Sequence, residues 1–135
     1  MLRFFTVLAA VALLLCACGG AGARPGYTAT QQASDGVTIT LERPSSVTLL
    51  QDYEFFVTLS DAGGQPIDGA TVFLEQDMPA MPMGTNQPLG EPLGKGQYRI
   101  KGVFTMDGQW IVKIHASIAG KEHVATFEQS VAPVK

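Results

Sequence analysis

The most informative absence in this sequence is that of cysteine after the first 18 residues. The chain has two cysteines, Cys16 and Cys18, and none between Gly19 and Lys135. That long segment therefore cannot hold a disulfide framework, a thiol nucleophile or a thiolate metal site.

Charge of either sign is sparse, and the formal net charge is −3. No basic cluster is present, which argues against nucleic-acid binding and against a polybasic contact with anionic lipids. The sequence also lacks a Ser-His-Asp or Cys-His arrangement and a Gly-rich phosphate loop, since Gly94-Lys95-Gly96 is typical of a turn. We therefore expect a protein that is not an enzyme.

Only one long uncharged apolar run occurs, over residues 4–15, and it is shorter than the roughly 20 residues that span a bilayer. With Arg3 before it, the run predicts a signal peptide over residues 1–17. Leu15-Cys16-Ala17-Cys18-Gly19 has the form of a lipobox, and Cys18 is favoured as the lipidated residue because the small Ala17 precedes it. A plain cleaved secretory signal is the alternative.

Lipidation of Cys18 predicts an extracytoplasmic protein, held by its N-terminal lipid at the periplasmic face of a bacterial membrane or at the cell surface. Loss of Arg3 with the signal leaves eight Lys and Arg against twelve Asp and Glu, a net charge of −4. Residues 18–35 are rich in Gly, Ala, Ser, Thr and Gln and predict a flexible tether. Residues 36–135 then form a single domain.

Helical periodicity is missing from this domain, and alternation with period two runs through most of it. Six strands are predicted, with a short seventh over 46–50; the six are 36–42, 52–60, 70–76, 97–104, 109–118 and 121–130. Turn residues separate these runs, as at Asp107-Gly108 and Ala119-Gly120. The pattern predicts an all-β, immunoglobulin-like β-sandwich of about seven strands.

The last hairpin allows a prediction of register. A two-residue loop at Ala119-Gly120 would pair Ala116 with His123, so that inward positions face each other. A four-residue loop keeps the same parity and would place Lys113 opposite Glu128, whereas a three-residue loop is disfavoured.

Two phenylalanines, Phe56 and Phe73, fall on the outward parity of the second and third predicted strands. If those strands are neighbours, the pair forms an exposed apolar patch that marks a partner surface. Coverage by a loop or by the tether is the alternative.

Asp77-Met78-Pro79-Ala80-Met81-Pro82-Met83-Gly84, here called the methionine loop, breaks the alternation. Its prolines favour a stiff, extended chain. Thioether sulfur is a soft, neutral ligand that suits Cu(I) and keeps its function where thiols are oxidised. Met78, Met81 and Met83 are therefore candidate Cu(I) ligands, with Met106 and either His115 or His123 as further ones. His115 has outward parity, whereas His123 has inward parity.

Methionine also fills gaps in apolar cores, so the loop has two other interpretations. It can close the open end of the sandwich, or it can present a peptide-binding surface.

Three blocks of the sequence resemble the YtkA-like (FixH-related) domains of bacterial envelope proteins. They are Gln65-Pro66-Ile67-Asp68-Gly69-Ala70-Thr71-Val72, the run from Met78 to Met83, and Gly96-Gln97-Tyr98 followed by Phe104-Thr105-Met106-Asp107-Gly108-Gln109-Trp110. The resemblance implies an anchored immunoglobulin-like sandwich linked with heavy-metal efflux or copper-enzyme assembly. Related domains often carry a histidine in the methionine loop, and this chain has none there.

The leading functional hypothesis is a lipoprotein that binds Cu(I) or another soft metal for copper handling or copper-enzyme assembly. The alternative is a non-catalytic structural or interaction module of an envelope complex, with a membrane protein as its partner. A sandwich that binds carbohydrate or peptide is a third hypothesis, weakened because Trp110 is expected in the core.

Overall fold

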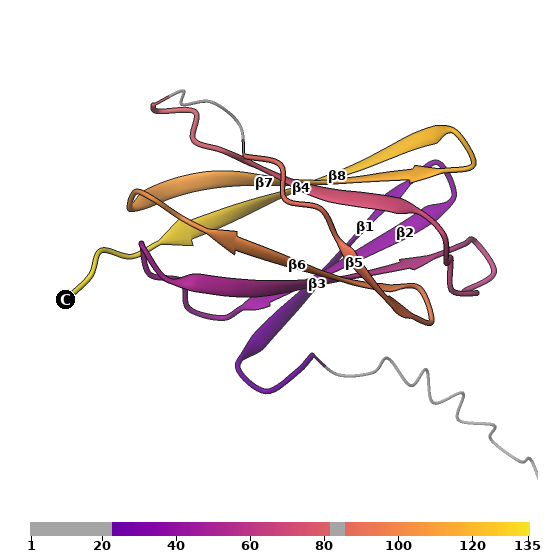
Figure 1. The fold of residues 1–135 in the computed structure, drawn as a ribbon, viewed down its shortest axis with the longest axis horizontal. Coiled ribbons are helices and arrows are strands. Elements are labelled where there is room, and N and C mark those ends of the chain that lie inside the picture. Colours follow the sequence, from indigo (N-terminus) through magenta and orange to yellow (C-terminus); the bar gives the residue numbers. More distant parts are fainter. Residues whose placement is uncertain (1–22, 82–85) are drawn as a thin grey trace, which may run out of the picture.

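A computed structural model describes residues 23–81 and 86–135. The described chain forms eight β-strands (Figure 1). They are β1 (Tyr27–Ser34), β2 (Val37–Pro44), β3 (Asp52–Ser60), β4 (Thr71–Asp77), β5 (Glu91–Gly94), β6 (Gln97–Val103), β7 (Gly108–Ile118) and β8 (Lys121–Val131). The predicted signal peptide, Cys18 and Met83 lie outside the described residues.

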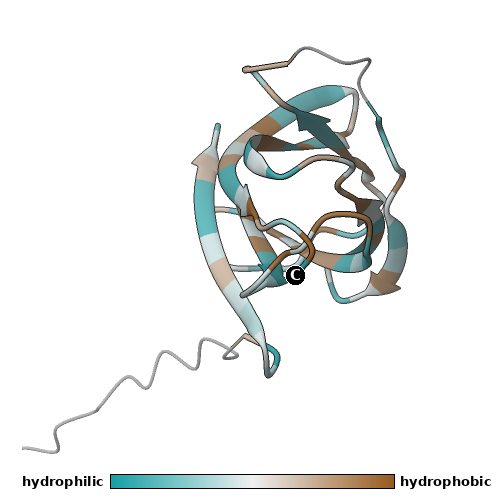
Figure 2. Cartoon of the chain, turned by 90° about the vertical axis from the view of Figure 1, so that its left-hand side faces the viewer, coloured by the Kyte–Doolittle hydropathy of each residue, from teal (hydrophilic) through white to brown (hydrophobic). Residues whose placement is uncertain are grey.

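The strands form two antiparallel sheets, one with the order β1-β2-β3-β6-β5 and one with the order β4-β7-β8. The structure thus confirms the predicted all-β sandwich. Figure 2, viewed from one end, shows hydrophobic and hydrophilic residues alternating along the strands that surround the core.

The core consists of the inward side chains predicted from the alternation. Alternate residues are buried in β2, β3, β4, β6, β7 and β8, because successive side chains point to opposite faces of a sheet, whereas β1 and β5 bury none of their residues. The largest fully buried side chains are Tyr98, Phe55, Phe104, Ile39, Leu41, Leu59, Leu74, Ile100, Ile114, Val57, Val72 and Val112.

The prediction of a flexible tether up to residue 35 is wrong for its second half, because Tyr27–Ser34 forms β1. This strand pairs with β2 along its whole length, from Tyr27 opposite Pro44 to Ser34 opposite Val37. Asp35 and Gly36 connect the two strands with φ values of +46° and +80°. Positive φ at both central residues is the geometry of a type I′ hairpin, for which Asp-Gly is a preferred sequence.

The predicted strand at 46–50 is also wrong, since only Thr48 forms an isolated bridge there, parallel to Ala132. The short strand β5 was not predicted. Residues 86–90 pair with the outer edge of β4, and β5 then pairs with β6 in the other sheet. The chain crosses from one sheet to the other at this point (Figure 1).

The hairpin between β7 and β8 has the two-residue loop and the register predicted for it. Ala116 lies opposite His123, and Ile114 lies opposite Ala125. The four-residue alternative is wrong, since Lys113 faces Thr126.

The hydroxyl of the buried Tyr98 fixes the connection that leads into β4. It accepts a hydrogen bond from the Ala70 N–H at 3.1 Å and donates one to the Ile67 carbonyl at 3.0 Å. Removing a buried hydroxyl leaves its partners unsatisfied, so we expect Tyr98→Phe to lower the free energy of unfolding by about 2 kcal/mol.

Urea unfolding monitored by circular dichroism measures this loss. Tyr53→Phe is the matched control because the Tyr53 hydroxyl also accepts one bond and donates one, to neighbours that are partly exposed. The same loss in both variants would contradict the role given to Tyr98.

Candidate functional site

The methionine loop begins where β4 ends, and its first methionine continues the inward parity of that strand. Met78 is 8% exposed and belongs to the core. A Cβ atom on Gly108 would lie only 2.9 Å from the Met78 Cε, which shows how closely the thioether packs against the start of β7. Met78 therefore contributes to packing at this end of the sandwich.

The loop then turns outward. The Met81 N–H donates to the Met78 carbonyl at 3.0 Å, and the Met81 side chain is 49% exposed. Unlike Met78, Met81 presents its sulfur side chain to solvent.

Met106 lies in the connection between β6 and β7, where a hydrogen bond from the Trp110 side chain holds its backbone. The Trp110 Nε1–H donates to the Met106 carbonyl at 2.9 Å, and the Met106 side chain is half-buried against the core. The Trp110 ring packs edge-on against Phe104 at 5.2 Å between ring centroids. The buried position of Trp110 agrees with the sequence-based expectation for this residue.

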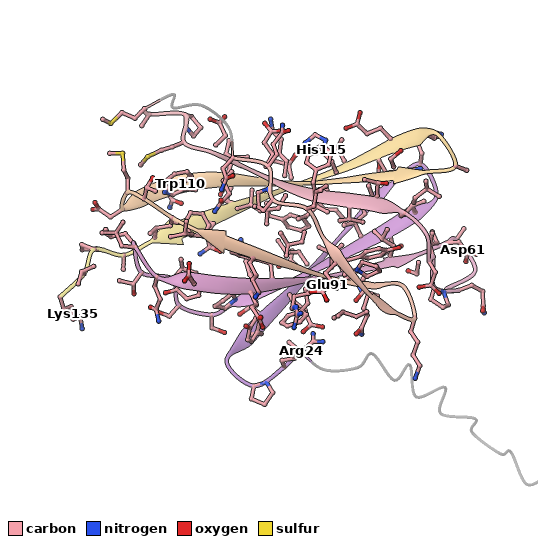
Figure 3. All side chains as sticks on the ribbon, in the orientation of Figure 1. Arg24, Asp61, Glu91, Trp110, His115 and Lys135 are labelled. Atoms are coloured by element: carbon pink, nitrogen blue, oxygen red, sulfur yellow. The ribbon has the colours of Figure 1, made fainter. Side chains whose placement is uncertain are left out.

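The three described methionines of the candidate site lie at one end of the sandwich. Met78 packs beside Gly108, which is two residues from Met106, and Met81 follows in the same loop. The sulfur atoms in Figure 3 gather at the end of the molecule where Trp110 is labelled. We call this region the methionine end.

A shallow hollow of about 280 Å³ adjoins this end, lined by Pro79, Gln109, Trp110, Ile111 and Glu128. Gln129 faces Trp110 across the β7–β8 ladder, and its buried amide oxygen has no hydrogen-bond partner among residues 23–81 and 86–135. Sequence reasoning did not select Gln129. The alternation of β8 places Gln129 on the same inward face as Phe127, and this polar residue at a core position was the feature of the sequence that could have identified it.

The structure does not bring His115 to the methionine end. His115 pairs with Phe73, five residues before Met78, which corresponds to about 17 Å along a strand. Its ring stacks on Phe73 with 4.4 Å between centroids and 5° between planes. Figure 3 shows His115 on the outer face of the three-stranded sheet.

Both ring nitrogens of His115 contact carboxylates. Nε2 lies 2.7 Å from Glu75 Oε2, and Nδ1 lies 2.6 Å from Glu122 Oε1. His115 therefore belongs to a cluster of polar side chains with Glu75, Glu122 and Lys113, in which Lys113 lies 3.6 Å from Glu75.

His123 also lies apart from the methionine end, near the β7–β8 turn. It is 4% exposed, and its Nδ1 donates to the Ser34 carbonyl at 2.9 Å, since a carbonyl can only accept. The contact ties β8 to the end of β1.

The predicted patch of Phe56 and Phe73 does not exist, because β3 and β4 belong to different sheets. Phe56 is covered by Tyr27, at 5.8 Å between ring centroids, and by the Arg24 guanidinium at 3.6 Å from the ring centroid. Arg24 also forms a 2.6 Å ion pair with Glu42. The segment that was expected to be a tether therefore covers one of the two rings.

Ionic contacts continue across this outer face at Arg99, which lies opposite Phe56 on β6. The hydrogen bond and positive charge of Arg99 lower the pKa of the Glu91 carboxyl, and Glu91 raises the pKa of Arg99. Both groups are solvent-accessible, so the pair contributes little to stability.

Among the described residues, no three His, Cys, Asp or Glu side chains are grouped so as to hold a metal ion. Nor does the described part of the chain contain a helix that is long and apolar enough to cross a membrane.

Comparison with known families shows a match to the YtkA-like family model over residues 31–115. This region is more than half of the chain, and it contains the methionine loop, Met106 and Trp110. The chain belongs to the YtkA-like family. Comparisons with curated proteins and with solved structures gave no match. The YtkA-like region starts within β1 and ends within β7.

Proposed function

We propose that this YtkA-like protein is an extracytoplasmic lipoprotein, anchored through Cys18, that binds Cu(I) or another soft metal ion at its methionine end. The observation that carries the proposal is the placement of Met78, Met81 and Met106 at one end of the sandwich. The proposed role is copper handling or copper-enzyme assembly, without catalysis.

The chemistry of the side chains fits a soft cation. Thioethers remain uncharged ligands at any pH and select Cu(I) over hard ions. Met81 is exposed and Met106 is half-buried, so both are available to a metal without unfolding of the core. Met78 would have to leave its packing against Gly108 to join them. Met83, the remaining proposed ligand, lies outside the described residues.

An anaerobic competition titration against a chromogenic Cu(I) chelator tests the proposal, using the processed full-length protein in detergent. We expect the wild type to compete and the Met81→Leu/Met106→Leu double variant to bind at least about tenfold more weakly, since each lost ligand removes more than 1 kcal/mol. Leucine keeps the size and apolar character of methionine, so the fold should be retained.

Trp110 is the only tryptophan of the chain and serves as a local reporter. Metal binding at the methionine end should change its fluorescence in the wild type and not in the double variant. His115→Asn is the matched control, because His115 lies about 17 Å away along the strands, and it should bind like the wild type. Equal affinity of the wild type and the double variant, with unchanged urea midpoints, would refute the metal site.

One observation favours a second candidate function, a non-catalytic structural or interaction module of a membrane-associated envelope complex. Met78 is a core residue, and Pro79 and Ile111 line a hollow beside it. These features suit a loop that closes the sandwich and contacts a partner protein. Absence of Cu(I) competition, together with co-purification of an envelope membrane protein that is lost in Met81→Asp, would support this function instead.

A further inference from the structure

The sandwich has four edge strands, β1 and β5 in one sheet and β4 and β8 in the other. The outer edges of β5 and β4 are blocked against further pairing. β5 is four residues long, contains Pro92 and has an irregular register between Pro92 and Gly94. Short, proline-containing and irregular strands are the devices by which edges avoid pairing. The edge of β4 is occupied by residues 86–90, whose backbone groups bond to Val72 and Leu74.

The edge of β8 is occupied by side chains. The Gln32 amide donates to the Thr126 carbonyl and accepts from the Thr126 N–H, so it imitates a strand at that position. The Arg43 guanidinium donates to the Glu128 carbonyl, and burial lowers its pKa. Further along, residues 47–49 bond to both backbone groups of Ala132.

Only β1 presents an open outer edge among the described strands. The Ser45 N–H donates to the Gly26 carbonyl, so Gly26 and the even-numbered residues of β1 direct their backbone groups towards β2. Pro44, which has no N–H, falls opposite Tyr27 and agrees with this parity. The residues that direct their N–H and C=O groups away from β2 are therefore Tyr27, Ala29, Gln31 and Ala33.

Three of these residues make the edge suitable for strand addition. Ala29, Gln31 and Ala33 are exposed, and the Tyr27 N–H is already bonded to the Arg24 carbonyl. The eight residues of β1 contain no charge and no proline. Unpaired backbone groups along such a strand are a template for another strand.

We propose that β1 pairs in antiparallel fashion with β1 of a second copy of this chain, around a two-fold axis at Gln31. In this register Gln31 faces its own counterpart, and Ala29 faces Ala33 of the other copy. These are the residues whose backbone groups point outward, so each facing pair exchanges two hydrogen bonds. The two five-stranded sheets become one continuous sheet.

A second copy is favoured over an unrelated strand because the edge is complementary to itself. Without charges in β1, no like charges face each other across the axis. The axis is perpendicular to the sheet, so the outer faces of both copies lie on the same side. Arg24 covers Phe56 on that outer face, and Figure 3 places Arg24 on the side opposite His115.

Both chains therefore enter the paired sheet from the same side, as two chains anchored in one membrane require. Anchoring would also concentrate the copies at the membrane surface. The strand pairing itself does not depend on metal binding, so it can hold or fail independently of the copper proposal.

Cysteine cross-linking of the full-length chain in its native membranes tests the register. Facing residues of an outward-bonded pair have Cα atoms about 5.5 Å apart, which permits a disulfide. We expect Gln31→Cys to give a disulfide-linked dimer on a non-reducing gel. Ala33→Cys is the matched control, because its counterpart is displaced by four residues, about 13 Å, and should cross-link at least fivefold less.

Two further strains complete the test. Co-expression of Ala29→Cys with Ala33→Cys should restore the dimer, and the wild type, run in parallel, accounts for Cys16 and Cys18. The proposal is overturned if Gln31→Cys remains monomeric, if all three single variants cross-link equally, or if Gln31→Cys is captured by a different protein.

Charge at the axis gives an independent measurement in gently solubilised membranes. Gln31→Lys and Gln31→Glu should each shift the protein to monomer in native electrophoresis, and a mixture of the two should recover a mixed dimer. Dimers that persist in both single variants would also overturn the proposed register.

Discussion

Replacing Gly96 by alanine is expected to lower the free energy of unfolding by about 3 kcal/mol, in the range of the most damaging single substitutions. Gly96 is buried at the turn before β6 and has φ of +72°, which L-residues with a Cβ rarely adopt. A Cβ there would lie 2.6 Å from the Leu59 carbonyl oxygen and 3.0 Å from the Pro66 Cβ. Substitution therefore combines backbone strain with a clash against main-chain atoms.

The backbone at Gly96 cannot easily move away from this clash. Its N–H donates to the Asp68 carboxylate at 2.8 Å, and its carbonyl accepts from the Leu59 N–H at 2.8 Å. Relief of the overlap would lengthen these bonds. The position thus holds three chain segments together, at Leu59, Ile67 and the start of β6.

Gly94→Ala provides a control in the same turn. Gly94 has φ of +86°, and a Cβ there would meet nothing within 4 Å. Only the strain of the left-handed conformation applies, so we expect a loss of about 1 kcal/mol. Urea unfolding monitored by Trp110 fluorescence compares the two variants, and equal losses would show that the close approach at Gly96 has no energetic weight.

A chain that starts at Gly36 is expected to lose about 3 kcal/mol of stability relative to one that starts at Ala23. The shorter chain lacks β1, so the hydrogen bonds between β1 and β2 are lost. Phe56 also loses its contacts with Tyr27 and Arg24. Each ladder hydrogen bond contributes about 1 kcal/mol net, and the entropy of ordering eight residues offsets much of the sum.

Thermal and urea unfolding of the two chains measure this difference. A third chain, starting at Ala23 with Gln32→Ala and Arg43→Ala, keeps β1 but removes the side chains that bond to β8. It should fall between the other two. A chain from Gly36 that is as stable as the chain from Ala23 would restore the interpretation of residues 18–35 as a tether.

Strands that bury one complete face were predictable from sequence. In β3 and β7 every inward position except the ends is apolar, as at Phe55, Val57 and Leu59, and burial of this face specifies the register. The β7–β8 hairpin followed in the same way, because a two-residue loop at Ala119-Gly120 preserves the parity of both strands.

The strands that escaped prediction bury little apolar surface. β1 consists of Tyr, Thr, Ala, Gln and Ser, and its pairing depends on hydrogen bonds to β2 more than on side-chain burial. The sequence feature that indicates β1 is Asp35-Gly36 directly before Val37, because Asp-Gly is a preferred turn sequence between two hairpin strands. β5 contains a proline and a glycine, which argue against a strand by propensity alone.

Part of the candidate site was predictable for a related reason. Met78 and Met81 belong to one short loop, so their proximity follows from the sequence alone. The approach of Met106 to this loop, the separation of His115 from Met78, and the absence of a Phe56–Phe73 patch depend on which strands pair, above all on the pairing of β4 with β7. Local periodicity does not contain that information, because it gives the face of a residue and not its neighbours.

The crossing segment at residues 86–90 has a consequence for how the methionine loop responds to a ligand. The Gln76 N–H bonds to the Asn86 carbonyl, so both ends of the loop are already held together beside β4. A short closed loop samples far fewer conformations than a free segment of equal length. For residues 77–81, where the Met81 N–H also bonds to the Met78 carbonyl, part of the conformational entropy that a ligand would otherwise remove is therefore lost when the domain folds. Association at Met81 then needs correspondingly fewer contacts for a given affinity.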